Sequence, residues 1–195
     1  MEDSAQKPVV YICHGDDLAA IEQFVAGMMA HISDPTLADL NISRLDGRQA
    51  SLEDLRTAVM AIPFLAERRI VVFRNPLARA DGKNKAGQQR FTEILNQVPL
   101  STALVLPIED EIERKDWRLL PERKPHWLRA WIASAGKRVH LRVCRLPQVN
   151  RMSDWIVAQA SAMGGRFTQP AAQALTALLG NDTRIAQQEI RKLLE

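Results

Sequence analysis

The sequence predicts an α/β fold in which a parallel five-stranded sheet has helices on both faces and a small three-helix domain follows. Five short apolar runs alternate with segments of helical period, which is typical of parallel strands joined by crossover helices. The run 70–73 is apolar throughout and rich in β-branched residues, as expected of a strand covered on both faces. Only helical periods remain after residue 147, so we expect two domains, 1–146 and 147–195.

The first half of the chain alternates between strand and helix. The apolar run 9–13 ends in a polar turn, and apolar residues then recur at helical spacing from 18 to 28. The segment 40–45 alternates apolar and polar residues, which predicts a half-buried strand. Ser51 is expected to cap the next helix, and Pro63 to end it before the strand at 70–73.

The second half continues this alternation and then becomes helical. The elements expected in order are a polar loop (74–87), a helix (91–98), a strand (103–106), a charged irregular segment (109–125), a helix (127–132) and a fifth strand (139–144). The helices of the second domain are expected at 151–163, 169–179 and 182–195. Because the last one has no C-terminal stop signal, we expect the chain to be part of a longer protein.

The composition is that of an ordinary globular protein, with 46% hydrophobic and 25% charged residues in a chain of 195. No apolar run approaches the ~18 residues needed to cross a bilayer, and the acidic N-terminus has no apolar leader. We therefore expect a cytoplasmic protein with no membrane partner. Cys13 and Cys144 lie in apolar runs and are expected to be buried thiols, and no residues have metal-ligand spacing.

The turn after the first strand stands where a phosphate-binding loop would be, but its residues do not suit that role. Such a loop needs several glycines, a Lys and a Ser or Thr, whereas the sequence His14-Gly15-Asp16-Asp17 has one glycine and two carboxylates that would repel a triphosphate. Asp16 and Asp17 are better explained as caps of the following helix, with a metal or acid/base site at His14 as the alternative. We expect no catalytic residue, no cofactor and no enzyme activity of the chain by itself.

Two large apolar residues, Phe64 and Leu65, fall in the connection after Pro63. One interpretation is that they fold back as a plug under the sheet. The other is that they form an exposed protein-binding knob, since exposed apolar clusters mark interaction sites.

The stretch 111–151 is basic, with 11 Lys or Arg against 4 Asp or Glu, which suggests a face for acidic partners or nucleic acid. Aromatic residues lie among these charges, and such residues can stack on nucleic-acid bases. Trp127 and Trp131 have the spacing of a core-facing helix, so they are expected to pack in the core, and the role of Trp117 is left undecided. A nucleic-acid-binding module using 114–151 is therefore an alternative function. The possible DNA-binding residues are Arg114, Lys115, Trp117, Arg118, Arg123 and Lys124.

The order of these parts resembles the delta subunit family of the bacterial DNA polymerase III clamp loader, and the resemblance covers nearly the whole chain. The segments that carry it are Tyr11-Ile12-Cys13-His14-Gly15-Asp16-Asp17, Leu45-Asp46-Gly47 with the helix after Ser51, Phe64-Leu65-Ala66-Glu67-Arg68-Arg69-Ile70-Val71-Val72, and Trp155-Ile156 through Gly180-Asn181-Asp182 to Glu189.

The resemblance implies a function in DNA replication. It implies an AAA+-like domain without a functional phosphate-binding loop at 1–146 and a helical lid at 147–195, with the family's collar domain absent from this chain. It also implies that Phe64 and Leu65, flanked by Ile62 and Pro63, insert into a pocket of the sliding clamp, which favours the knob over the plug. The implied partners are the clamp (beta subunit), the gamma/tau and delta prime subunits and, weakly, primed DNA, and the chain would be a non-catalytic clamp-opening subunit.

Overall fold

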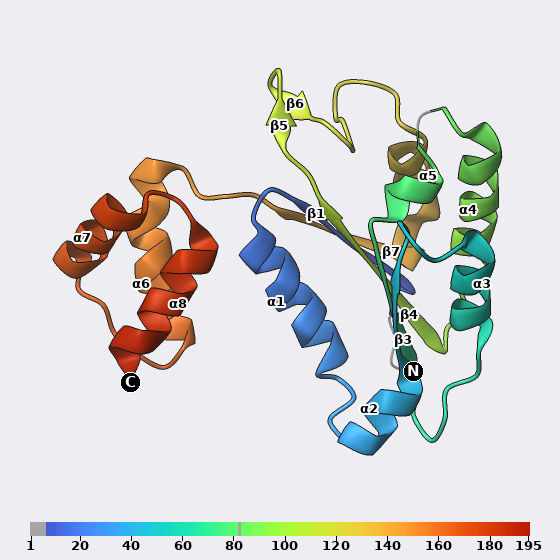
Figure 1. The fold of residues 1–195 in the computed structure, drawn as a ribbon, viewed down its shortest axis with the longest axis horizontal. Coiled ribbons are helices and arrows are strands. Elements are labelled where there is room, and N and C mark those ends of the chain that lie inside the picture. The colour runs from blue at the N-terminus through green and yellow to red at the C-terminus, as the bar shows by residue number, and fades with distance from the viewer. Residues whose placement is uncertain (1–6, 82) are drawn as a thin grey trace, which may run out of the picture. The chain divides into compact units, whose positions relative to one another are not determined.

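The computed structural model describes residues 7–81 and 83–195, and they form two compact units. The larger unit contains the residues up to Gly15 and Ile21–Val143, and the smaller contains Asp16–Ala20 and Cys144–Glu195. Figure 1 shows both units, each of which is described below by itself.

A five-stranded parallel sheet forms the centre of the larger unit (Figure 1). The strands, in their order across the sheet, are β2 (Ile42–Asp46), β3 (Arg69–Arg74), β4 (Thr102–Glu109), β1 (Val10–Gly15) and β7 (Val139–Cys144). The parallel register pairs Ile42 with Ile70, Val71 with Leu104, and Val10 with Leu104. The amino ends of the strands therefore share one edge of the sheet, and the carboxyl ends share the other.

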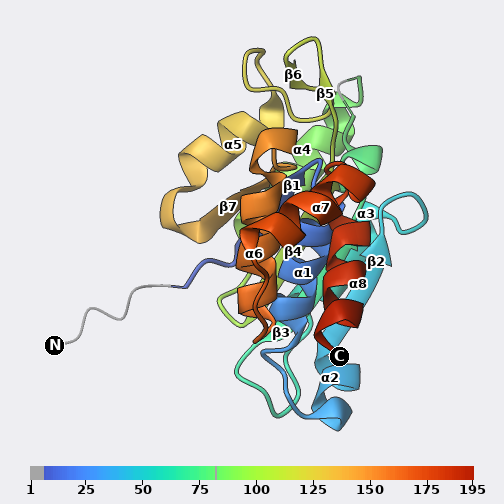
Figure 2. The same cartoon turned by 90° about the vertical axis from the view of Figure 1, so that its left-hand side faces the viewer.

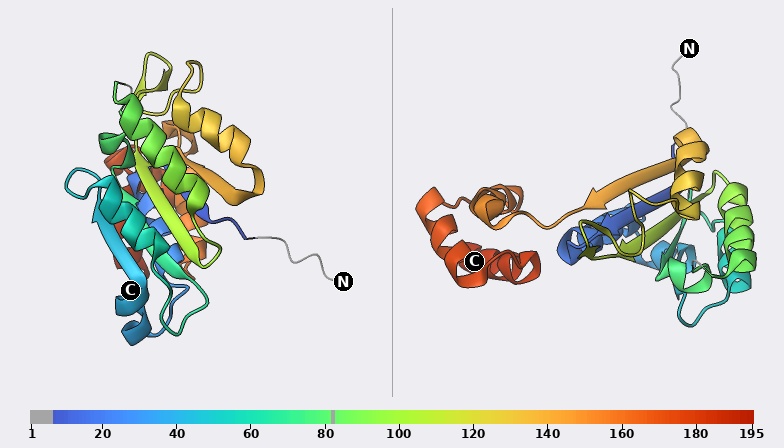
Figure 3. Two further views of the ribbon diagram at one scale, coloured as in Figure 1. Left: turned by 90° about the vertical axis from the view of Figure 1, so that its right-hand side faces the viewer. Right: turned by 90° about the horizontal axis from the view of Figure 1, so that it is seen from above.

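Helices cover both faces of this sheet, as Figures 1 and 3 show. Helix α1 (Leu18–Met29) lies on one face; α3 (Leu52–Met60), α4 (Lys85–Gln97) and α5 (Trp127–Ala135) lie on the other. The face covered by α3 to α5 holds the main core, where Leu55, Phe91 and Leu128 pack against alternate strand residues such as Val71 and Phe73. Remaining short elements are α2 (Pro35–Asn41), η1 (Pro76–Arg79), η2 (Gly136–Arg138), η3 (Val149–Arg151), β5 (Ile112–Glu113) and β6 (Asp116–Trp117).

Several parts of the larger unit differ from the sequence prediction. The predicted polar loop at 74–87 contains η1, and helix α4 begins at Lys85 rather than at the predicted residue 91. The predicted strand at 40–45 begins only at Ile42, because helix α2 extends to Asn41. Asp34 caps the start of this helix by accepting a hydrogen bond from the backbone N–H of Thr36. The segment 109–125, predicted to be irregular, contains the antiparallel β5–β6 hairpin. The predicted burial of Cys13 and Cys144 is confirmed.

The smaller unit contains the three C-terminal helices α6 (Met152–Ala162), α7 (Gln169–Leu179) and α8 (Thr183–Leu194), which Figure 2 shows in orange and red. Their core includes Ile156, Leu175 and Ile190. Thr168 and Asp182 cap α7 and α8 through their side-chain oxygens. Small helices of this kind depend on packing, so the shared core holds them together.

Candidate protein-docking site

The connection between α3 and β3 displays apolar side chains to solvent at the amino edge of the sheet. Ile62 is 87% exposed, Phe64 54% and Leu65 78%, while Pro63 is half-buried. The plug interpretation is therefore wrong in this structure, because neither Phe64 nor Leu65 fills the core. Since large apolar groups gain free energy on leaving water, the cluster is suited to a partner surface.

The sequence around this connection explains why it leaves the core. Ser51 and Asp54 form a reciprocal capping box that fixes the start of α3, and the buried face of the helix ends at Val59. Ala61 is already extended, and Pro63 prevents the helix from continuing. Leu65 has a φ of 50°, which is uncommon for a side chain of this size. The strained backbone turns the Leu65 side chain outward.

Asn41 holds the exposed loop in place. Its side-chain oxygen accepts a hydrogen bond from the backbone N–H of Phe64 at 2.7 Å, and its amide nitrogen donates to the carbonyl oxygens of Phe64 at 2.8 Å and of Leu37 at 2.9 Å. Asn41 is fully buried. One buried amide thus satisfies both backbone groups of Phe64 and orients the apolar residue, a role that the sequence analysis missed.

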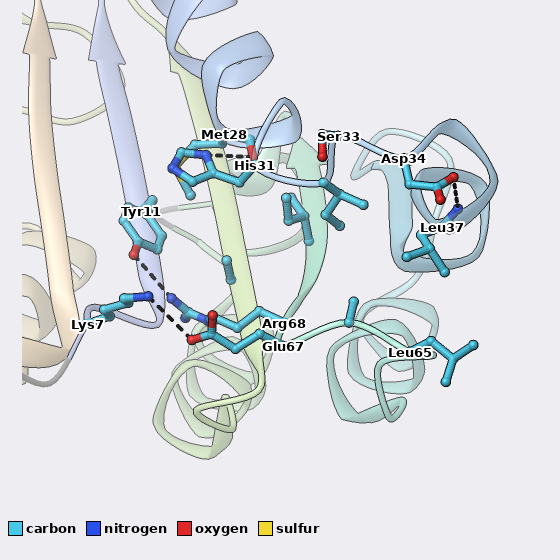
Figure 4. A pocket seen from close by; sticks show the side chains of 14 residues that line it. Lys7, Tyr11, Met28, His31, Ser33, Asp34, Leu37, Leu65, Glu67 and Arg68 are labelled. Carbon is cyan, nitrogen blue, oxygen red and sulfur yellow. Dashed lines mark hydrogen bonds and ion pairs between the residues drawn. The ribbon is translucent and has the colours of Figure 1, made fainter.

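A cavity of about 450 Å³ lies beside Leu65, on the side of the sheet that α1 covers (Figure 4). Met28, Leu37 and Ile70 contribute apolar surface to it. Arg68 closes one wall, where its guanidinium donates to the carbonyl oxygens of Pro8 and Thr102 at 2.9 and 2.7 Å. These bonds fix the start of β3 and hence the end of the exposed loop.

The carboxyl edge of the sheet, where parallel α/β proteins usually bind ligands, contains one buried polar pair, while Glu109 at the end of β4 is exposed. His14 Nε2 lies 2.9 Å from Asp110 Oδ2, and both side chains are inaccessible to solvent. Asp110 also accepts from the backbone N–H groups of Glu111, Leu119 and Leu120. These contacts anchor the segment after β4.

The pKa values at this pair follow from burial and hydrogen bonding. Burial lowers the pKa of His14 below its ordinary value of 6.5, despite the opposing effect of Asp110. Burial alone would raise the pKa of Asp110, but the bonds from His14 and the three backbone N–H groups outweigh it and lower that pKa. We conclude that His14 is neutral and Asp110 ionised at neutral pH.

Asp16 and Asp17 are both engaged within the smaller unit. The Asp17 carboxylate accepts from the backbone N–H of Ala20, which is a helix cap, and from the hydroxyl of Thr183 at 2.7 Å. The predicted capping role is therefore correct for Asp17. The Asp16 carboxylate instead accepts a hydrogen bond from the backbone N–H of Leu146 at 2.7 Å. It contacts the segment after β7 and does not cap α1.

The basic residues of 114–124 lie on and after the β5–β6 hairpin. The two-residue turn is Arg114-Lys115, and both have positive φ values, of 51° and 67°. Both side chains are exposed, as are those of Arg123 and Lys124, while the exposed Arg118 pairs with Glu111 at 2.9 Å. Trp117 is only 3% exposed and lies edge-on to His14, so its ring does not face solvent. The idea of Trp117 as a base-stacking platform has no support from this position.

No group of three or more His, Cys, Asp or Glu residues suited to a metal ion occurs within 7–81 and 83–195. Across the same part of the chain, no helix has the length and apolar character required to span a membrane.

The fold and the site together define a parallel α/β protein with an exposed apolar loop at the amino edge of its sheet and a turn at the other edge that lacks the residues of a phosphate-binding loop. The chain belongs to the family described as DNA polymerase III, delta subunit, whose model matches residues 11–129, more than half of the sequence. No curated protein matches the sequence.

Solved structures share the fold. The clamp loader delta protein of Bacillus subtilis superimposes with a TM-score of 0.73 at 21% identity, covering 96% of this chain and 53% of that one. A DNA polymerase III gamma subunit-related protein from Thermotoga maritima gives a TM-score of 0.55 at 18% identity, covering 96% of this chain and 54% of that one. The chain thus spans about half the length of the solved proteins that it matches.

Proposed function

We propose that this chain is the clamp-binding part of a DNA polymerase III delta subunit, acting in DNA replication in the cytoplasm. The observation that carries the proposal is the exposed pair Phe64 and Leu65, flanked by Ile62 and Pro63, on a loop that a buried asparagine holds in place. Such a pair is suited to an apolar pocket on a partner, here the sliding clamp (beta subunit).

The proposed mechanism is differential binding. A protein that binds one interface of a ring more tightly in its open geometry shifts the ring towards opening by that difference in free energy. In this proposal 1–146 is an AAA+-like domain, 147–195 is a helical lid, and other clamp-loader subunits (gamma/tau and delta prime) bind ATP. The chain itself is not an enzyme.

The absence of a nucleotide site has a direct test. Asp16 and Asp17 are already hydrogen-bonded, and the turn lacks the Lys and Ser or Thr of a phosphate-binding loop. ATP with Mg²⁺ is expected to leave the melting temperature unchanged, whereas a ligand at a hundred times its Kd would add about 2.7 kcal/mol to the stability. A saturable rise of several degrees would overturn the non-catalytic proposal.

The clamp contact is tested by the double variant Phe64→Ala/Leu65→Ala. Each side chain contributes roughly 1.5 to 3 kcal/mol if it becomes buried, so the pair is expected to contribute at least ~3 kcal/mol, about a hundredfold in affinity. Clamp binding is measured by surface plasmon resonance with the beta clamp of the same source, and thermal unfolding in parallel.

A matched control replaces two exposed leucines of the three-helix unit, Leu178→Ala/Leu193→Ala. The control is expected to bind the clamp like the wild type, and both double variants are expected to melt close to it. Clamp binding that survives Phe64→Ala/Leu65→Ala would refute the proposal, as would a wild-type chain that does not bind the clamp.

A second, weaker contact with primed DNA is favoured by the hairpin, whose turn places Arg114 and Lys115 in solvent next to the exposed Arg123 and Lys124. Phosphate contacts of this kind weaken steeply with salt. Gel-shift assays are expected to show weak, sequence-independent binding that is lost at high salt and in the variant Arg114→Ala/Lys115→Ala. Tight, salt-resistant binding would instead favour a nucleic-acid-binding module.

A further inference from the structure

Arg69, the first residue of β3, is a buried cation without a carboxylate partner. It is only 8% exposed, and its side chain makes one hydrogen bond, from Nη2 to the hydroxyl of Ser43 at 2.8 Å. Its Nε is buried and has no hydrogen-bond partner. No acidic side chain within residues 7–81 and 83–195 forms an ion pair with it.

A buried charge in this state is costly. Removing a guanidinium from water without a counter-charge destabilises a fold, and buried ions are normally paired. Burial lowers the pKa of Arg69, but an arginine starts so high that it remains charged at neutral pH. The positive charge is therefore retained although nothing in the described part of the chain neutralises it.

The guanidinium of Arg69 belongs to the residue that follows the docking loop, the connection of residues 61–68 between α3 and β3. Arg69 follows Leu65 by four residues, and its guanidinium is bonded to Ser43. Ser43 is two residues along the chain from Asn41, the side chain that holds Phe64. The uncompensated cation and the apolar pair are thus fixed to the same short segment at the amino edge of the sheet.

We propose that Arg69 is a carboxylate-binding site that receives an acidic side chain of the sliding clamp when Phe64 and Leu65 dock. This inference rests on the proposed clamp-binding function. The planar guanidinium offers two parallel N–H groups to a carboxylate, and docking of the loop excludes water around the pair. The stability that the free chain loses by burying Arg69 is recovered in the complex, which makes the residue a determinant of partner choice.

The neighbouring Arg68 provides a comparison within the same loop. Its guanidinium donates to two backbone carbonyl oxygens, of Pro8 and Thr102, which tie it to two other segments of the chain, although its Nε, like that of Arg69, is buried without a hydrogen-bond partner. Replacing an arginine that stabilises the fold is expected to lower the melting temperature. Replacing an arginine that binds a partner is expected to lower the clamp affinity. The two residues can therefore be separated by measuring both quantities.

The experiment compares Arg69→Met, Arg69→Lys and Arg68→Met in thermal unfolding and in clamp affinity. Methionine keeps an unbranched apolar stem, so Arg69→Met is expected to melt at or above the wild type and to bind the clamp roughly tenfold or more weakly. Arg69→Lys is expected to bind with intermediate affinity, because lysine cannot form the bidentate contact. Arg68→Met is expected to melt below the wild type.

A double-mutant cycle then identifies the partner group. Acidic residues on the clamp are replaced singly by their amides, and one of these changes is expected to cause no further loss when Arg69 is already methionine. Normal clamp affinity of Arg69→Met, or additive losses at every acidic position, would overturn the inference while the Phe64→Ala/Leu65→Ala result still supports the proposed function. An Arg69→Met protein that melts well below the wild type and binds the clamp normally once folded would show a purely structural arginine. If the wild-type chain does not bind the clamp, the proposed function fails first.

Discussion

The two edges of the central sheet differ in the side chains that they bury and in those that they expose to solvent. At the carboxyl edge, His14 and Asp110 are buried polar groups that bond each other and the neighbouring backbone. At the amino edge, Phe64 and Leu65 are apolar groups left exposed. Parallel α/β proteins usually bind ligands at the carboxyl edge, so the proposed clamp contact at Phe64 and Leu65 lies at the opposite edge from the usual ligand site.

The largest effect that tests this contrast is expected at Asp110. Asp110→Ala removes the acceptor of three backbone N–H groups and of His14, and it leaves the buried His14 and the buried N–H of Leu120 without that partner. Breaking a buried, charged network of this kind is expected to cost about 3 to 5 kcal/mol of unfolding free energy, measured by urea denaturation. The folded fraction is expected to bind the clamp with unchanged affinity, and a change in affinity would show that the two edges are not separate in function.

A smaller effect on stability, combined with one on binding, is expected at Asn41. Asn41→Ala removes the hydrogen bonds to both backbone groups of Phe64, which is expected to cost about 1 to 3 kcal/mol. Because the loop is then free to move, clamp affinity is expected to fall roughly tenfold through faster dissociation. Asn84→Ala, which removes the cap of α4, serves as the control that loses stability only. Equal affinities of the two variants would show that Asn41 does not position the loop.

The smallest effect concerns pH. Since the pKa of His14 is lowered in the folded state, the unfolded chain binds a proton more readily, and stability is expected to fall as the pH drops through about 6.5. Asp110 contributes in the same direction only at lower pH, because its own pKa is lowered from 3.8. Thermal unfolding between about pH 7.5 and pH 5 is the measurement.

The variant His14→Gln keeps a donor for Asp110 and removes the titration, so its stability is expected to depend less on pH over that range. Some dependence remains, because burial and Arg129 lower the pKa of His126 as well. A pH dependence identical to that of the wild type would exclude His14 as its source.

The strands and most helices could be predicted from the sequence, because their signals are local. Apolar runs indicated most strands, alternation of apolar and polar residues indicated the strand at 40–45, and the pair Ser51 and Asp54 indicated the start of α3. The turn of the β5–β6 hairpin could not be predicted, since Arg114 and Lys115 occupy positions that normally favour Asn and Gly.

The exposed apolar loop could be located from the sequence, but the side chain that holds it in place could not. Pro63 followed by Phe64 and Leu65 was visible, whereas Asn41 contacts Phe64 across 23 residues and His14 contacts Asp110 across 96. Such pairings depend on the order of strands in the sheet. The burial of Arg69 without a carboxylate partner could not be predicted from the sequence either. Whether a single arginine is buried depends on tertiary packing.

Hydrogen–deuterium exchange of the wild-type chain, with and without the sliding clamp, compares the two edges directly. The amides of Ile62 and residues 64–67 are expected to become protected when the clamp is added, and those around Gly15 and 110–120 to exchange as before. Protection confined to the carboxyl edge, or unchanged exchange at 62–67 under conditions where the clamp is bound, would contradict the assignment of the docking surface to the loop that carries Phe64 and Leu65.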